Sequence, residues 1–194
     1  MRTNRLVAAT VLILVAGCAA PSLSPALAPS PMPEWMTEID WDPLRTPLQL
    51  PTLQAGDPCP VTPASTTSVP NVSSVLGDGP IFPWGTGRAA PGDLFFDGDV
   101  YRLKVLWIID PDRYAGPALV RGARIDGPSV TPLLFFYADE GPYAELRLGR
   151  QGWVYGGTGM HEFNSETGFP GIGCFAYQID GIGFHKTIVV EILE

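Results

Sequence analysis

The best candidates for catalysis lie in the Gly-rich stretch GGTGMHEFNSETG at residues 156–168. It places His161 and Ser165 close in sequence to Glu162 and Glu166, and these are the residue types of a hydrolytic triad. The chain has no G-x-S-x-G motif, so no serine is presented on the sharp turn that this chemistry often uses. Nothing in the spacing makes the side chains converge. We therefore interpret the stretch as a polar surface loop, predict no catalytic residue, and keep an envelope hydrolase as the alternative.

Metal ligands are also sparse. The two histidines, His161 and His185, are 24 positions apart, whereas a zinc site takes several His or Cys ligands. Carboxylates at residues 97–99 (DGD), 110–112 (DPD) and 139–140 (DE) are candidates for calcium, but none extends into the spacing of a calcium-binding loop. Asp beside Gly or Pro is typical of turns. We predict no metal site and no cofactor.

Aromatic residues beside loops are the candidates for binding. Trp153, Tyr155 and Trp84 lie next to Gly- and Pro-rich segments, where exposed rings would stack on a glycan or contact an envelope protein. The alternative is ordinary packing in the core or at its rim. The rings must be exposed and grouped together to form a binding site.

The N-terminus has the features of a secretory signal. Arg2 and Arg5 precede the apolar run LVAATVLILVAG at residues 6–17. A charged start followed by about 7–15 apolar residues is typical of a signal peptide, and the run is shorter than the roughly 20 residues of a membrane-spanning helix. We predict a signal peptide over residues 1–17.

Residues 15–18, VAGC, resemble the lipobox of bacterial lipoprotein precursors, which has a branched apolar residue, two small residues and a cysteine. The resemblance implies cleavage between Gly17 and Cys18 and a diacylglycerol group on Cys18. Acyl chains such as palmitate anchor stably, because each buried methylene contributes about 0.8 kcal/mol. We therefore predict a lipoprotein on the extracytoplasmic face of the cell membrane, or on the outer membrane if the organism has one. An ordinary signal peptide followed by a chance cysteine is the alternative.

The charge balance excludes one class of partner. Cleavage removes two of the 12 basic residues and none of the 20 acidic ones, so the mature chain has a formal charge of −10. Binding to nucleic acid requires basic patches. We therefore predict no nucleic-acid partner, and a membrane contact made through the lipid.

Two further cysteines, Cys59 and Cys174, form an even pair 115 positions apart in an oxidising compartment. We predict that they form a disulfide bond. A catalytic thiol at Cys174 is the alternative, but a free thiol beside a second cysteine outside the cytoplasm is expected to oxidise.

The chain divides into four parts. After the signal peptide, residues 18–33 form a lipid-anchored linker with five prolines, which adopts an extended conformation of about 3.1 Å per residue. Residues 34–57 form a transition segment with Trp35 and Trp41, which we expect to pack against the domain; contact with the bilayer interface is the alternative. Residues 58–194 form one domain.

Strand and turn signals fill this domain. With 22 Gly, 21 Pro and 16% charged residues, the composition favours short strands over helices. Residues 101–109, YRLKVLWII, alternate so that Leu103, Val105 and Trp107 share one face. Further strands are predicted at residues 118–125, 133–138, 144–148 and 152–155.

The last predicted unit is a hairpin of residues 174–179 and 184–193. Its apolar face carries Phe175, Tyr177 and Ile179, which leaves Cys174 on the other face and His185 toward solvent. About seven short strands with turns between them indicate a β-sandwich. The alternation predicts that the disulfide lies on the exterior of the sandwich.

Several motifs together resemble a group of small, uncharacterised bacterial lipoproteins and secreted proteins. They are CPVT at residues 59–62, GDGP at 77–80, KVLW at 104–107, VRGARIDG at 120–127 and Pro170-x-x-x-Cys174. The resemblance covers about residues 58–193 and implies an immunoglobulin-like sandwich outside the cell. The group commonly has a tryptophan where this chain has Phe175. It implies no activity.

Three hypotheses follow. The first is a membrane-tethered, immunoglobulin-like binding or accessory module without enzymatic activity. The second is an envelope hydrolase that uses His161 with Glu162 or Glu166. The third is a purely structural envelope protein.

Overall fold

A computed structural model describes residues 29–32, 38–54, 56–67, 69, 71–127, 130–137, 140–149, 153–154 and 160–194, without the side chains of 153 and 154. The predicted signal peptide, Cys18 and Trp35 lie outside the described residues. In the described part of the chain, no helix has the length and apolar character to cross a bilayer.

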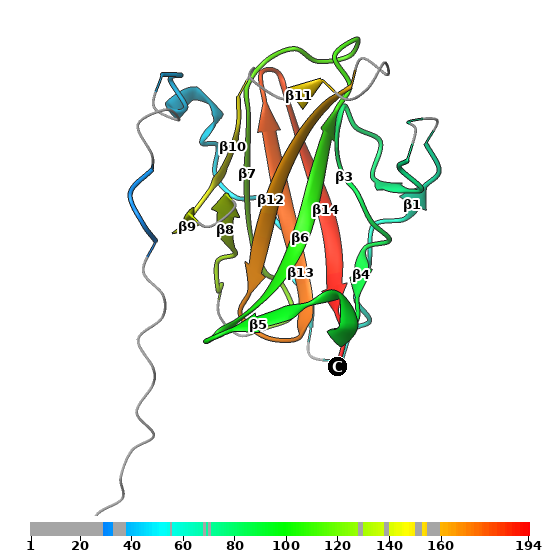
Figure 1. The fold of residues 1–194 in the computed structure, drawn as a ribbon. Coiled ribbons are helices and arrows are strands. Elements are labelled where there is room, and N and C mark those ends of the chain that lie inside the picture. Colours follow the sequence, from blue (N-terminus) through cyan, green and yellow to red (C-terminus); the bar gives the residue numbers. More distant parts are fainter. Residues whose placement is uncertain are drawn as a thin grey trace, which may run out of the picture.

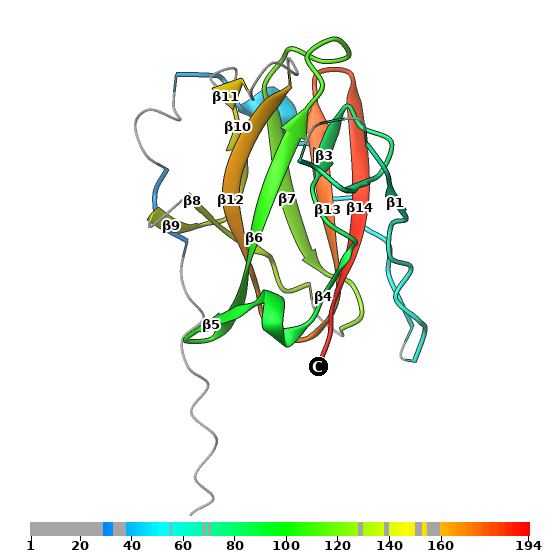
Figure 2. The same ribbon diagram turned by 45° about the vertical axis from the view of Figure 1, so that its right-hand side comes forward.

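Two β-sheets pack face to face and form an all-β sandwich (Figure 1, Figure 2). The five-stranded sheet has the order β10-β7-β13-β14-β4, and its strands are β4 (Arg88–Ala89), β7 (Ala118–Arg124), β10 (Leu146–Leu148), β13 (Gly173–Gly181) and β14 (Phe184–Ile192). All its pairings are antiparallel except that of β4 with β14.

The seven-stranded sheet has the order β3-β6-β12-β8-β9, with β5 also paired to β6 and β11 to β12. Its strands are β3 (Ile81–Pro83), β5 (Phe95–Asp97), β6 (Val100–Ile109), β8 (Leu134–Tyr137), β9 (Glu140–Tyr143), β11 (Trp153–Val154) and β12 (His161–Phe169). A separate ladder pairs β1 (Ala64–Ser65) with β2 (Val75–Leu76), and two 3-10 helices are η2 (Asp42–Leu44) and η3 (Pro91–Asp93).

The core lies between the sheets and follows the predicted alternation. Val105, Trp107 and Ile109 of β6 face it, and Trp107 is fully buried with its ring edge-on to Tyr177, at 5.4 Å between centroids. The predicted hairpin is confirmed as β13 and β14, which pair over their whole length. His185 is exposed, as the alternation predicts.

The interpretation of residues 156–168 as a loop is wrong for the described part. Residues 161–169 form β12, which pairs with β6 on one side and with β8 on the other. Ser165 and Thr167 take inward positions between the apolar Phe163 and Phe169 and are buried, so two polar residues interrupt the apolar inward pattern by which strands are recognised. The expected number of about seven strands is also too low, because many of the described strands have only two to four residues.

The transition segment packs against the domain along the outer face of the five-stranded sheet. Trp41 is buried with Leu44 against Leu119 of β7. Farther along, Leu53 N–H donates to the carbonyl of Ile125 at 3.0 Å. We call residues 39–54 and 56–62 the strap, because they cross this sheet face in a largely extended conformation (Figure 2).

The buried carboxylate of Asp180 holds the middle of the strap to the sheet. Asp180 is 1% exposed and accepts hydrogen bonds from Thr46 Oγ1 at 2.7 Å and from Arg121 Nη2 at 2.7 Å. The side-chain Oε1 of Gln178, which is also buried, accepts from the backbone N–H of Gln49 at 2.6 Å. Buried polar groups of a sheet face are thus satisfied by the strap, and they would lose these partners without it.

The predicted disulfide joins Cys59 to Cys174. Cys174 is buried on the outer face of β13 in a cluster with Ala176 and Val189, which the strap covers. The bond therefore holds the strap to the exterior of the sandwich, as the alternation of β13 predicts.

Candidate functional site

An interruption in the edge of the seven-stranded sheet forms the candidate site. Strand β3 pairs with β6 at residues 107–109, and β5 pairs with it at residues 100–102. Between them the chain leaves this sheet after Trp84, crosses to the other sheet as β4, and returns through η3. In the described part of the chain, no strand covers this edge of β6 at residues 103–105.

The crossing depends on two glycines that flank Thr86. Gly85 and Gly87 have φ angles of +146° and +80°, a region that other residues rarely adopt. A Cβ at Gly87 would lie 2.5 Å from Cγ1 of Val61. The Gly87 carbonyl accepts from the N–H of Glu191 at 2.8 Å, which begins the pairing of β4 with β14.

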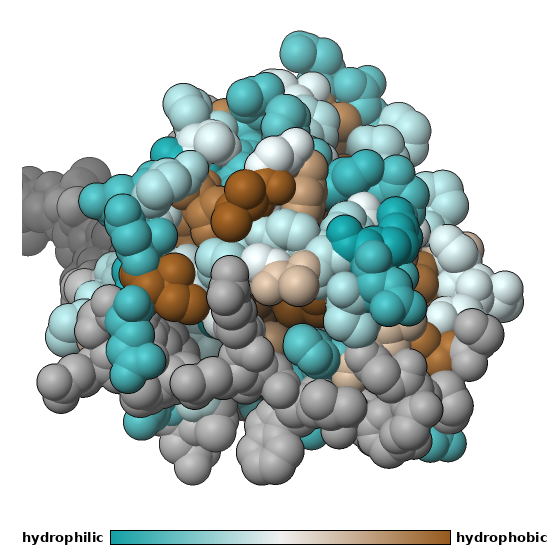
Figure 3. Space-filling model, turned by 90° about the horizontal axis from the view of Figure 1, so that it is seen from above, coloured by the Kyte–Doolittle hydropathy of each residue, from teal (hydrophilic) through white to brown (hydrophobic). Residues whose placement is uncertain are grey.

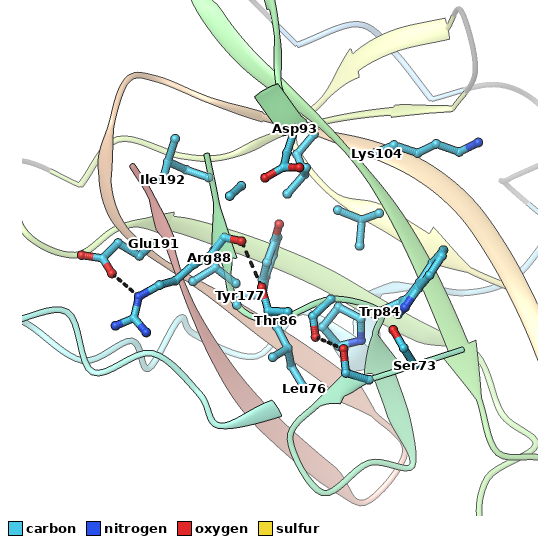
Figure 4. A pocket seen from close by; sticks show the side chains of 18 residues that line it. Ser73, Leu76, Trp84, Thr86, Arg88, Asp93, Lys104, Tyr177, Glu191 and Ile192 are labelled. Atoms are coloured by element: carbon cyan, nitrogen blue, oxygen red, sulfur yellow. Dashed lines mark hydrogen bonds and ion pairs between the residues drawn. The ribbon is translucent and has the colours of Figure 1, made fainter. Parts of the chain in front are cut away.

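A cavity of about 350 Å³ lies behind this interruption, between the two sheets (Figure 4). This size lies within the range of small-ligand sites. Its apolar lining comes from both sheets and from β2, namely Leu76, Leu103, Val105, Val190 and Ile192.

Tyr177 supplies the polar group in the interior of the cavity. Its ring is buried between the sheets, and the hydroxyl points into the open space (Figure 4). Burial raises the pKa of Tyr177 far above its ordinary value, and the Thr167 hydroxyl opposes this rise only in part. The phenol is therefore neutral at physiological pH, and it can donate or accept a hydrogen bond but does not act as a base.

The rim of the cavity is polar. Asp93 lies opposite Tyr177 (Figure 4), and its carboxylate accepts from the backbone N–H of Ala90 at 2.9 Å. Arg88 is paired with Glu191 at 2.8 Å. The ion pairs of the described residues do not include Asp93. Its negative charge is therefore available at the mouth of the cavity.

The predicted aromatic residues do not form one group. Trp84 lies at the cavity and is 44% exposed. Trp153 belongs to β11, which pairs with β12, and β12 and β6 lie between β11 and β3. Three strand spacings therefore separate the backbone of Trp153 from β3, a distance of about 14 Å. Tyr155 lies outside the described residues. Only Trp84 is placed at the candidate site.

The end of the sandwich that carries the β13–β14 turn is shown from above in Figure 3. Apolar residues are visible there among polar ones. Ile182 in that turn is 65% exposed.

The structure does not assemble the hydrolase alternative. His161 and Ser165 lie four residues apart on one extended strand, about 13 Å along β12. Glu162 and Glu166 alternate with them and face the other side of the sheet. Ser165 is 2% exposed, and Glu166 is ion-paired with Arg102.

The carboxylates that were candidates for calcium ligands lie in turns and have protein partners. Oδ1 of Asp110 accepts from the N–H of Asp112 at 3.1 Å, and Asp97 pairs with Arg102. Among the residues that the structure describes, no group of His, Cys, Asp and Glu has the arrangement of a metal site. Residue 139 lies outside them.

Comparison with protein-family models, curated proteins and solved structures finds no match for this chain. The resemblance to small lipoproteins therefore stays a prediction. The sequence did not suggest Tyr177 and Asp93 as residues of the site. No local motif indicates that the chain leaves the seven-stranded sheet between β3 and β5, which is what opens the cavity.

Proposed function

We propose that the mature protein is a lipid-anchored, extracytoplasmic binding module, and that the edge cavity beside Trp84 is its ligand site. The observation that carries this proposal is the cavity of about 350 Å³ between the two sheets, beside the open edge of β6. Protein interiors contain few voids larger than a water molecule. A cavity that is open at the edge, has an apolar lining from both sheets and carries the Tyr177 hydroxyl in its interior has the features of a binding pocket.

The chemistry of the cavity favours binding over turnover. Tyr177 is neutral at physiological pH, and burial raises its pKa further from the range in which a phenol acts as a base. Asp93 and the Arg88–Glu191 pair lie on the rim, not in the interior. We therefore prefer a binding or accessory role to the hydrolase. The purely structural role predicts that no ligand contacts this edge.

The rest of the proposal concerns location and fold type. The resemblance of residues 15–18 to a lipobox supports an anchor on Cys18 and attachment to the cell membrane, or to the outer membrane where there is one. The buried Trp107 beside Tyr177 in a two-sheet sandwich supports an immunoglobulin-like fold.

Site-specific crosslinking in cells tests the ligand site. A photoreactive phenylalanine analogue replaces Trp84 in the full chain, and the matched control replaces Ile182, which is also exposed but lies at the β13–β14 turn. We expect an adduct with an envelope component from position 84 and none from position 182. The same adducts from both positions, or none from either, would leave the structural role as the better explanation.

Membrane fractionation tests the anchor. Cys18→Ala removes the acceptor thiol, and Ser22→Ala is the matched change in the linker. We expect the first variant in the soluble fraction and the second in the membrane fraction. Mass spectrometry of the mature wild-type N-terminus should find an acylated Cys18, and an unmodified N-terminal peptide would contradict the anchor.

A further inference from the structure

We infer that the interruption in the edge of β6 binds a short extended segment of a partner polypeptide, which pairs with the backbone of Lys104 and inserts apolar side chains into the cavity. This inference rests on the proposed function and names the class of ligand. The argument uses the direction of the backbone groups of β6, the length of the opening, and the exposed residues around it.

The backbone of Lys104 points toward the open edge. Trp84 N–H donates to the carbonyl of Leu106 at 2.8 Å, so the Leu106 carbonyl faces the β3 side. Backbone groups alternate in direction along a strand, so the N–H and C=O of Lys104 face the same side. Among the described residues, no strand pairs with them. Unpaired backbone groups at a sheet edge are a template for another chain.

The opening limits how much chain can pair. From Leu106, which bonds to Trp84, to Arg102, which pairs with Phe95, the free edge measures about 13 Å. Because β3 and β5 pair with the same edge of β6 on either side of the opening, a bound segment can pair with β6 over only about three residues. Its two ends must then turn away from the surface.

Exposed aromatic rings lie at both ends of the opening, where the two ends of a bound segment would turn away from the surface. Trp84 is 44% exposed on the β3 side, and Phe95 is 45% exposed on the β5 side, with Phe96 beside it at 64%. They are the three aromatic residues among the exposed large hydrophobic residues that the structure describes, and all three lie on this edge. Exposed aromatic rings around a pocket are typical of protein contact sites.

Alternate side chains of a bound segment would point into the cavity and fill it. Residues directly opposite each other in an antiparallel pair project to the same face. The side chain of Lys104 points away from the cavity (Figure 4), so the residue that pairs with it also points outward. The residues before and after that one point inward, toward Val105, Leu103 and the Tyr177 hydroxyl.

Charge gives a further preference. Asp93 stands at the mouth of the cavity without an ion-pair partner among the described residues, and the chain as a whole has a formal charge of −8. A segment with basic residues beside the inserted apolar ones would therefore be favoured. The mostly apolar lining fits a peptide better than a glycan, whose many hydroxyls would lose their hydrogen bonds on entry.

The test uses a defined peptide and its N-methylated form. The probe is acetyl-Arg-Leu-Thr-Leu-Arg-amide, and the control carries an N-methyl group on the threonine, which removes the donor that faces Lys104 but keeps the side chains. Both are titrated into the ¹⁵N-labelled full chain with Cys18→Ser. We expect the unmodified peptide to bind at least fivefold more tightly and to slow hydrogen exchange of the Lys104 amide.

Two variants separate backbone from side chain. Lys104→Pro removes the N–H at the open edge, where proline is tolerated because that group has no partner strand. Lys104→Ala keeps the N–H and removes only the charged side chain. We expect the first to weaken peptide binding at least fivefold and the second by less than twofold. Circular dichroism checks that both are folded, and if Lys104→Pro unfolds, the N-methyl comparison carries the test.

Three outcomes would overturn the inference. They are equal binding of both peptides, protection of the Lys104 amide by chitohexaose in place of the peptide, and an adduct from position 84 with no binding of either peptide. Where position 84 also gives an adduct, the ligand site beside Trp84 stands in each of these cases and only the ligand class fails. Absence of both the adduct and peptide binding would remove the proposed function as well.

Discussion

The indole N–H of Trp107 donates a hydrogen bond of 3.0 Å to Oγ of Ser165 in the centre of the sandwich. Trp107 belongs to β6 and Ser165 to β12, and both side chains are buried between the sheets. The Ser165 hydroxyl also lies 3.5 Å from the Val105 carbonyl. This serine therefore satisfies a buried donor, and it has no access to a substrate.

Replacing Ser165 should reduce stability without affecting any surface. Ser165→Ala leaves the Trp107 N–H buried and unsatisfied, which costs about 1–3 kcal/mol of unfolding free energy. Asn164→Ala is the matched control, because Asn164 is the exposed neighbour on the same strand. Urea denaturation measures both, and equal midpoints for the two variants would contradict the role of the hydrogen bond.

Replacing Tyr177 by phenylalanine tests the hydroxyl of the cavity. The change keeps the ring packed against Trp107 and removes a hydroxyl that lines the cavity and interacts with the Thr167 hydroxyl. We expect the unfolding free energy to fall by about 0.5–1.5 kcal/mol because the interaction with the Thr167 hydroxyl is lost, while capture of the ligand by the photoreactive group at position 84 decreases. Unchanged capture would show that the hydroxyl makes no contact with the ligand.

The disulfide should contribute substantially to stability. Removing it with Cys59→Ala and Cys174→Ala should lower the unfolding free energy by about 2–4 kcal/mol, because the loop of 115 residues is no longer closed in the unfolded chain. Urea midpoints of the variant, and of the wild type with and without a reducing agent, measure the effect. A midpoint that does not respond to reduction would contradict this prediction.

Glu145 should make stability depend on acidic pH. Desolvation raises its pKa, but hydrogen bonds from Arg45 and Arg147 outweigh this effect and hold the pKa below its usual value of 4.5. A carboxyl with a lowered pKa in the folded state stabilises the protein above pH 4.5, and this contribution is lost as the pH falls through the folded-state value. Glu145→Gln should therefore be less stable than the wild type near pH 6, and the difference should shrink by pH 3.

Urea unfolding at pH 6 and pH 3 measures this difference. The control is Glu140→Gln, at an exposed carboxyl that forms no ion pair with a described basic residue. A gap between wild type and Glu145→Gln that is the same at both pH values would contradict the role of the arginines.

Local alternation was enough to predict the main strands. In β6 and in the β13–β14 hairpin, most inward positions carry a large apolar residue, with Lys186 as an exception in β14, so the period of two is visible in the sequence. The exterior position of Cys174 followed from the same rule. These features depend only on neighbouring residues, which is why they could be predicted.

The remaining features depend on contacts that are distant in the sequence. In β12 the inward Ser165 is satisfied by Trp107, 58 positions away, so a polar residue occupies a core position without a local sign. The crossing of β4 to β14 and the resulting cavity bring residue 88 beside residue 191. Of the candidate site, the sequence therefore indicated Trp84 but neither the cavity nor Tyr177.

The covalent link between the strap and β13 also determines how the domain responds to tension. A pull on the proposed N-terminal anchor can extend only the chain that precedes Cys59, since the next 115 positions are closed into a loop by the bond to Cys174. Force then passes directly into the hairpin at the centre of the five-stranded sheet and bypasses β3, β4 and β5. The edge cavity would keep its shape while the tether is stretched.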